Sequence, residues 1–70
     1  MKYEVILKQR HNHNPYETKY HCIVSEDRLE FVKNRYEQEA KDIEDRIHNC
    51  ECLVLINKLD DNGEFVDVIQ

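Results

Sequence analysis

Residues 25–49 read SEDRLEFVKNRYEQEAKDIEDRIHN, and this stretch decides the fold. Apolar side chains recur in it at intervals of three or four residues, which is the period of one face of an α-helix. They are Leu29, Val32, Tyr36, Ala40, Ile43 and Ile47. Ser25 is a residue type that caps helix N-termini, and Glu26 and Asp27 suit the positive end of the helix dipole. We therefore predict one long amphipathic helix that ends near Asn49.

Short stretches with the alternating pattern of β-strands lie on both sides of this helix. Before it come residues 2–9 and 18–24, which are joined by a loop in which Asn precedes Pro. After it come residues 51–58, apolar on both faces, and residues 64–69, with the turn sequence DDNG at 60–63 between them. The chain is therefore expected to contain two β-hairpins separated by a helix.

The predicted fold class is α+β, in a single domain over residues 1–70. It is a ββαββ arrangement, with a four-stranded antiparallel sheet and one long helix on one face. The most apolar strands, 2–9 and 51–58, belong in the middle of the sheet, and the more polar strands belong at its edges. Both hairpins stay antiparallel if the strand order is 2-1-3-4. Many small intracellular and phage-borne modules share such an architecture, which by itself implies no activity.

The charge balance bears on the class of ligand. The chain has 70 residues, with 15 acidic against 10 basic residues and a formal net charge of −5. Such a balance disfavours nucleic acid or an anionic membrane as the direct ligand and leaves open a basic protein partner. We expect no secretory signal and no membrane span, and three cysteines, an odd number, fit a reducing compartment. A cytoplasmic location is therefore expected.

Histidine and cysteine side chains cluster in the stretch RHNHNPYETKYHC, residues 10–22, and again after the helix. The topology is expected to bring seven of them to one end of the sheet. They are His11, His13, His21, Cys22, His48, Cys50 and Cys52. Imidazole and thiolate are ligands that zinc prefers, so five of the seven form a candidate zinc site. The five candidate metal ligands are His11, His13, His48, Cys50 and Cys52.

The spacing of these residues does not specify a metal site. The paired Cys-x-x-Cys of zinc knuckles is absent, and His-x-His only places alternate residues on one face of an extended chain. Cys22 and Cys52 also fall in phase with the core-facing residues, whereas His11 and His13 lie in a polar loop. We therefore expect a structural loop and no cofactor, with zinc binding as the alternative.

Few residues favour catalysis. A thiol nucleophile could combine Cys50 or Cys52 with His48, but no third residue that would orient the histidine is apparent. The one glycine lies in the predicted turn, so a phosphate-binding loop is not expected. Asp60 and Asp61 lie in the same turn, and turn formation explains them. The chain is therefore expected not to be an enzyme, and a small thiol or metal-dependent enzyme is the alternative.

One helix covers one face of a four-stranded sheet, so the other face is expected to be exposed. Seven apolar residues are assigned to the covered face: Tyr3, Val5, Leu7, Val54, Ile56, Val66 and Val68. Five others then point away from the helix: Ile6, Ile23, Leu53, Leu55 and Phe65. An exposed apolar patch of this kind usually marks an interface. We therefore predict a protein-binding surface there, and a homodimer in which Leu53 and Leu55 meet their counterparts. The alternative is a patch diluted by the stems of lysine side chains.

The length and phase of the helix lead to two further expectations. Phe31 lies roughly 140° from the centre of the apolar stripe, which predicts an exposed aromatic residue that anchors a partner. A helix of about 23 residues spans roughly 34 Å, whereas a strand of about seven residues spans roughly 23 Å. Ile43 and Ile47 are therefore expected to overhang the sheet and to need cover from a second copy.

The charged residues of the helix allow two interpretations. Glu37 with Lys41 and Asp42 with Arg46 have the spacing of favourable ion pairs, which predicts a solvated, self-paired face. The acidic residues alone could instead mimic phosphates and block a nucleic-acid-binding protein. They are Glu26, Asp27, Glu30, Glu37, Glu39, Asp42, Glu44 and Asp45.

Together these patterns predict a small, acidic, non-catalytic protein-interaction module that acts as a regulatory or inhibitory subunit. The alternatives are a zinc-binding module and an acidic mimic of nucleic acid.

Overall fold

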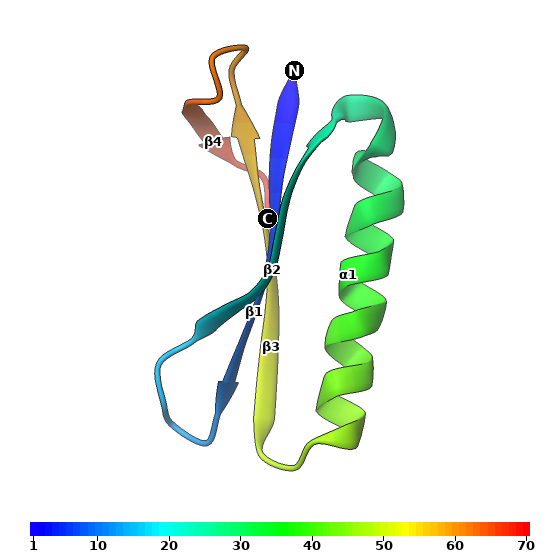
Figure 1. Cartoon of the computed structure of the whole chain (residues 1–70), viewed down its shortest axis with the longest axis vertical. Helices are drawn as coiled ribbons and strands as arrows, with labels where there is room; N and C mark the ends of the chain where they lie inside the picture. Colours follow the sequence, from blue (N-terminus) through cyan, green and yellow to red (C-terminus); the bar gives the residue numbers. More distant parts are fainter.

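The computed structural model describes all 70 residues and confirms the predicted ββαββ order. Its elements are β1 (Lys2–His11), β2 (Glu17–Ser25), α1 (Glu26–Arg46), β3 (Cys50–Leu59) and β4 (Phe65–Val68). The strands form one antiparallel sheet in the order β2-β1-β3-β4, as predicted. In Figure 1, α1 runs along one face of this sheet and β4 stands on the other side.

The two central strands, β1 and β3, are longer than the sequence pattern indicates. They pair without interruption from Lys2 opposite Leu59 to His11 opposite Cys50. The predicted first strand stops at residue 9 because Arg10 and His11 have little β-propensity, and the predicted third strand, residues 51–58, is one residue shorter than β3 at each end. In the structure the backbone groups of these polar residues still join the ladder, which extends the sheet under the last turns of the helix.

The helix begins at the predicted position and ends earlier than predicted. Ser25 occupies the N-cap position, but its hydroxyl donates to the carboxylate of Asp27 and makes no capping bond to the backbone. The last helical residue is Arg46, and the Ile47 N–H donates to the Ile43 carbonyl at 2.9 Å. Asn49 then adopts a left-handed conformation with φ of 59°, which turns the chain into β3.

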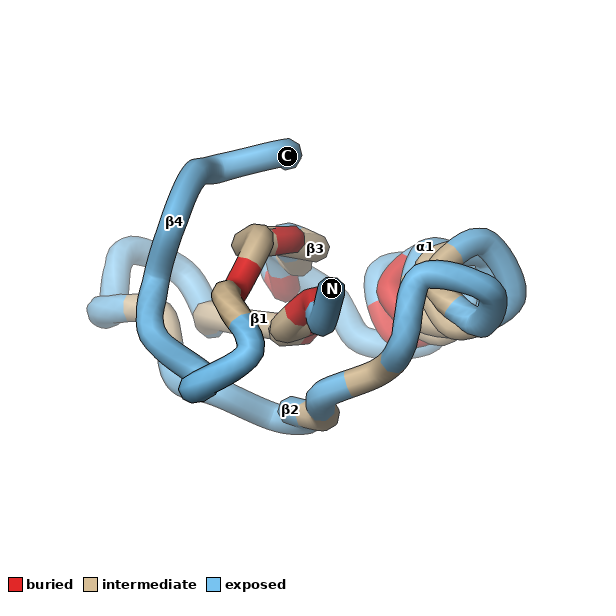
Figure 2. The backbone as a smooth tube through the Cα atoms, turned by 90° about the horizontal axis from the view of Figure 1, so that it is seen from above, coloured by how far each residue is buried: buried red, intermediate tan, exposed pale blue.

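The core lies between α1 and the face of the sheet that it covers, and Figure 2 shows the buried positions gathered on facing parts of β1, β3 and α1. Eight of the 70 residues are buried, so the core is small. Seven of them form two clusters on the helix side: Tyr3, Val5, Leu7, Ala40, Ile43, Cys50 and Ile56; the eighth, Leu59, belongs to neither cluster. Toward the end where β1 begins, Leu29, Val32 and Tyr36 of α1 pack on the cluster of Tyr3, Val5 and Ile56.

The expectation that Ile43 overhangs the sheet is wrong. Its side chain is 1% exposed and packs against Leu7, Ala40 and Cys50. The reason is the length of the strands, because β1 and β3 each have ten residues and reach this far along the helix. Ile47, at the C-cap, is 36% exposed and lies at the margin of the core.

The prediction that Val66 and Val68 of β4 face the helix is wrong. No residue of β4 contacts α1, and Figures 1 and 2 both place β4 on the opposite side of the sheet. A register shift between Lys58 and Leu59 interrupts the pairing of β3 with β4. Such a shift increases the twist of a hairpin, which carries β4 away from the helix side.

The turn before β4 has the conformation that its sequence predicts. The Asp60 carboxylate accepts from the backbone N–H groups of Asn62 and Glu64, both at 2.9 Å. Gly63 has φ of +83°, a left-handed conformation that glycine adopts without strain.

Candidate protein-interaction surface

Alternation along β1, β2 and β3 places four apolar residues on the face that α1 does not cover. Ile6 of β1 pairs with Leu55 of β3 and with His21 of β2. Leu53 of β3 pairs with Lys8, and Ile23 of β2 pairs with Glu4. These residues alternate with Val5 and Leu7, which pack beneath the helix. We call this surface the open face, and its apolar patch consists of Ile6, Ile23, Leu53 and Leu55.

The apolar patch is accessible to a partner. The Ile23 side chain is 53% exposed and that of Leu53 is 42% exposed, whereas Ile6 and Leu55 are half-buried between their neighbours. An antiparallel sheet with one solvated face normally carries polar residues there. Contiguous apolar side chains at the centre of such a face are typical of an interaction site.

A polar cluster lies across the open face toward the start of β1, next to Ile6 and Leu55 and between them and Ile23. His21 Nε2 donates to Glu4 at 2.7 Å, and the Asn57 amide donates to the other carboxylate oxygen of Glu4 at 3.0 Å. The Asn57 bond first, and then the His21 bond, lower the pKa of Glu4 below its ordinary value, while partial burial opposes them. Three strands are thereby linked by side chains on the open face.

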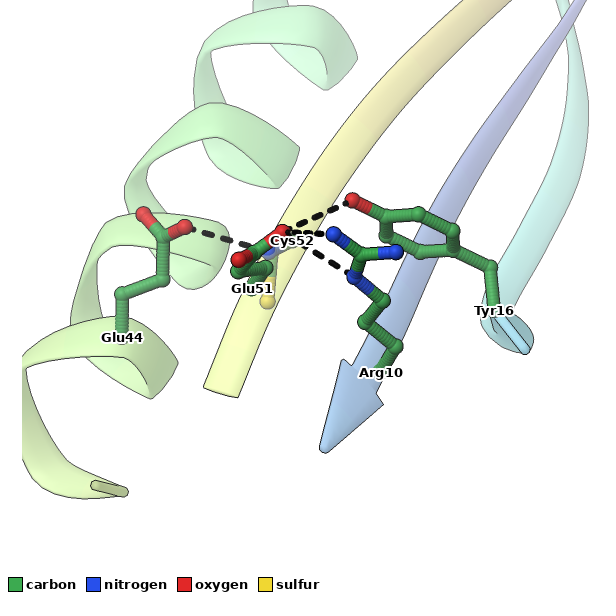
Figure 3. Close-up of polar contacts among 5 residues, drawn as sticks. All are labelled: Arg10, Tyr16, Glu44, Glu51 and Cys52. Atoms are coloured by element: carbon green, nitrogen blue, oxygen red, sulfur yellow. Dashed lines mark hydrogen bonds and ion pairs between the residues drawn. The ribbon is translucent and has the colours of Figure 1, made fainter. Parts of the chain in front are cut away.

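A second polar cluster, shown in Figure 3, bounds the patch at the other end. The Arg10 guanidinium donates two hydrogen bonds to one oxygen of Glu51, at 3.0 and 2.7 Å, and lies 4.8 Å from the centre of the Tyr16 ring. The Tyr16 hydroxyl also donates to Glu51, at 3.3 Å. The Arg10 bond lowers the pKa of the Glu51 carboxyl. This cluster was not predicted, because it depends on the register between β1 and β3, which brings together Arg10 and Glu51, 41 residues apart in the sequence.

Glu44 makes a different contact, from the helix to the free edge of β3. Its carboxylate accepts a hydrogen bond from the backbone N–H of Cys52 at 3.1 Å, as Figure 3 shows. Strand β4 is short and leaves this part of β3 without a strand neighbour. A charged side chain that occupies such a group protects the edge against uncontrolled strand pairing. The open face, more than this edge, is therefore available for binding.

The six residues predicted to bind protein do not form one surface. Ile6, Ile23, Leu53 and Leu55 gather in the patch. Phe65 lies on β4, where it pairs with Leu59 and is 61% exposed. Phe31 is 57% exposed on α1, as its helical phase predicts, with the guanidinium groups of Arg28 and Arg35 at 5.8 and 6.0 Å from its ring centre. Because α1 lies across the sheet from the open face, Phe31 belongs to a separate surface.

The predicted ion pairs of the helix are not formed. The Asp42 carboxylate accepts from the Gln38 amide at 3.0 Å, and Arg46 donates to the Asp42 backbone carbonyl at 3.2 Å. Arg46 instead approaches Glu39 at 4.0 Å, and Glu37 and Lys41 make no ion pair. Exposed pairs of this kind gain little free energy, so the side chains have no single preferred partner.

The histidines and cysteines converge only in part. His11 and Cys50 are register partners, Cys52 follows on β3, and His13 lines a hollow of about 330 Å³ together with Asn12, Asn49, Cys50 and Glu51. His48 is exposed in the connection between α1 and β3. No group of three or more His, Cys, Asp and Glu side chains lies in a geometry that could hold a metal ion. Zinc binding at these residues stays the alternative to the predicted structural loop.

His21 and Cys22 do not join this end of the sheet, contrary to the expectation. They pair with Ile6 and Val5 in the middle of β1, because β2 runs back along the whole length of that strand. Cys22 packs against the buried cluster of Tyr3, Val5 and Ile56, and all three cysteines are free thiols. Burial and the neighbouring Cys50 raise the pKa of Cys52 to about 11, so a thiolate nucleophile is disfavoured there.

A shallow cleft between β2 and α1 was also not predicted. It has a volume of about 300 Å³ and is lined by Tyr20, Arg35, Tyr36 and Glu39. The two tyrosine rings are 6.2 Å apart at an angle of 46°. Burial first, and a hydrogen bond with Cys22 second, raise the pKa of Tyr36 to about 12. Tyr36 therefore serves the core, and the cleft adds only a partly exposed Tyr20 to the surface.

The chain matches no protein-family model, and no curated protein or solved structure is significantly similar to it. Helix α1 is not apolar enough to cross a membrane. The functional proposal therefore depends on the geometry of the open face itself.

Proposed function

We propose that this chain is a small, acidic, non-catalytic protein-interaction module, and that it binds its partner through the open face. The observation that carries the proposal is the exposed apolar patch at the centre of that face. Each aliphatic side chain left in water forgoes roughly 1.5–3 kcal/mol of burial free energy. That is a large cost for a chain with only eight buried residues.

The surroundings of the patch support this proposal. Protein interfaces have an apolar centre and a polar rim. Here the Glu4–His21–Asn57 cluster flanks Ile6 and Leu55 on one side, and the Arg10–Tyr16–Glu51 cluster lies beyond Leu53 on the other. Both clusters are already hydrogen-bonded within the chain, so a partner that covers the patch leaves few unpaired polar groups. A module of this kind acts by covering a surface of its partner, which suits a regulatory or inhibitory subunit.

Affinity capture with matched variants tests the proposal. Leu53→Glu adds one negative charge to the patch, and Asn34→Glu adds the same charge to an exposed position on α1. Parent and variants are used as baits in lysate of the organism that encodes the chain, and captured proteins are quantified by mass spectrometry. We expect a set of proteins that Asn34→Glu retains and Leu53→Glu loses. Equal capture by both variants, with both baits folded by circular dichroism, contradicts the proposal.

A further inference from the structure

We propose that the partner of the open face is a second copy of this chain, and that each copy covers the bare end of the other's open face with its own β4 hairpin. This inference rests on the proposed function and specifies its partner. The β4 hairpin is defined here as residues 60–68.

The open face is covered at one end and bare at the other. Alternation along β3 places Leu53, Leu55, Asn57 and Leu59 on this face. Leu59 is 5% exposed, whereas Leu53, six residues earlier on the same strand, is 42% exposed. We attribute the difference to the β4 hairpin, which begins directly after Leu59, sets Phe65 opposite it in the register and stands on this side of the sheet (Figures 1 and 2). The Leu53 end has no such cover.

The β4 hairpin itself carries apolar side chains that the chain leaves largely exposed. Phe65, Val66 and Val68 are each at least half exposed. The helix does not contact β4, so its apolar residues gain no burial from the core. The chain thus presents two incomplete apolar surfaces, the β4 hairpin and the Leu53 end of the open face, at opposite ends of the same side of the sheet.

A two-fold axis that runs parallel to the open face and perpendicular to the strands, at the level of Ile6, brings these two surfaces together. It turns the second copy end for end, so the β4 hairpin of each copy lies over the Leu53 end of the other. Both contacts are identical, as a closed two-fold dimer requires. On β1 the same rotation sets Glu4 opposite Lys8 of the second copy. Lys8 takes part in no ion pair within its own chain.

The charge distribution favours this inverted orientation of the two copies over a face-to-face orientation with parallel strands. The β4 hairpin contains four acidic residues, Asp60, Asp61, Glu64 and Asp67, and no basic residue. The Leu53 end of the open face carries Lys8 and Arg10, and only Arg10 is paired, with Glu51. End-to-end inversion places the acidic hairpin near this basic end, whereas a parallel face-to-face arrangement would set the two acidic hairpins against each other. Complementary potentials fix the register of interfaces in this way.

The available area is sufficient for a weak dimer. The molecule is 39 Å long and 15 Å across the sheet, the direction of view in Figure 1. A face of that size amounts to about 600 Å² per copy, or about 1,200 Å² for the pair, which is the lower end of the range for specific interfaces. We therefore expect self-association at micromolar concentrations.

Sedimentation equilibrium on the full chain tests the inference. The parent is expected to dimerise, and Leu53→Glu or Val68→Asp to raise the dissociation constant by about 100-fold, since each buries a charge at the contact twice per dimer. Lys8→Glu and Glu4→Lys, which reverse the two charges that the rotation sets opposite each other, are each expected to raise it by about tenfold, and the double variant to restore it to within about threefold of the parent. All four positions are partly or fully exposed, so circular dichroism is expected to show folded variants.

Three results would overturn the inference. They are a parent that stays monomeric at high micromolar concentration, a dimer insensitive to Leu53→Glu and Val68→Asp, and charge reversals that the double variant does not rescue. A monomeric parent whose captured proteins still depend on Leu53 would refute the homodimer and leave the proposed function standing.

Discussion

Replacement of Ile43 by alanine tests where the core ends. The Ile43 side chain is 1% exposed and packs on Leu7, Ala40 and Cys50. The substitution removes three carbon atoms, which at about 0.8 kcal/mol each corresponds to about 2.4 kcal/mol of lost burial. The cavity that remains raises the expected loss to about 3 kcal/mol or more. At 0.05–0.15 kcal/mol per residue, a 70-residue chain has roughly 3.5–10 kcal/mol of stability in total.

Phe31→Ala is the matched control, because it removes a larger side chain from the exposed face of the same helix. Phe31 is 57% exposed and its ring is approached by the guanidinium groups of Arg28 and Arg35, so its loss is expected to cost less than about 1 kcal/mol. Urea unfolding followed by circular dichroism gives both free energies. The placement of the core is refuted if Ile43→Ala costs less than about 1 kcal/mol, or if Phe31→Ala costs as much as Ile43→Ala.

Three further measurements address the polar groups. The pKa of Glu4 is lowered in the folded chain, so its stabilisation is present above the ordinary value of 4.5 and is lost as the pH falls through the lowered value. Glu4→Gln is therefore expected to flatten the fall in urea midpoint below pH 4.5, and an unchanged acid limb would contradict the Glu4 contacts. The pKa of Cys52 is near 11, against an ordinary value of 9.0. At mildly alkaline pH, iodoacetamide is therefore expected to alkylate Cys52 about 100-fold more slowly in the native chain than in the denatured chain. Comparable rates, measured by peptide mass spectrometry, would refute this expectation. Protein purified without chelator is expected to hold less than stoichiometric zinc by elemental analysis. A content of one equivalent of zinc that is lost in the double variant Cys50→Ala and Cys52→Ala would instead establish the zinc site.

The sequence pattern predicts the fold where the determinants are local. The apolar stripe of the helix, the alternation of β1 and the Asp60–Gly63 turn each involve residues a few positions apart, and the structure confirms all three. The strand order follows from the same features together with the polarity of the edge strands. Two errors concern non-local effects. Strand length depends on what lies opposite Arg10 and His11, and the course of β4 depends on a register shift at Lys58.

The candidate surface was predictable to a similar degree. Alternation assigns Ile6, Leu53 and Leu55 to one face of the sheet, because a strand places every second residue on the same side. The contact of Arg10 with Glu51 requires the register between β1 and β3, and neither residue belongs to a motif. The burial of Leu59 beneath the β4 hairpin likewise needs the three-dimensional course of the chain.

Photo-crosslinking from position 53 in cells of the encoding organism tests most directly whether the open face binds protein. A photoreactive amino acid replaces Leu53 in one variant and Asn34, on the exposed side of α1, in a matched control. We predict a discrete covalent adduct from position 53 that the control does not form, at the mass of two chains if the partner is a second copy. The absence of any adduct from position 53, or the same adducts from both positions, would contradict the claim that the open face is the binding surface.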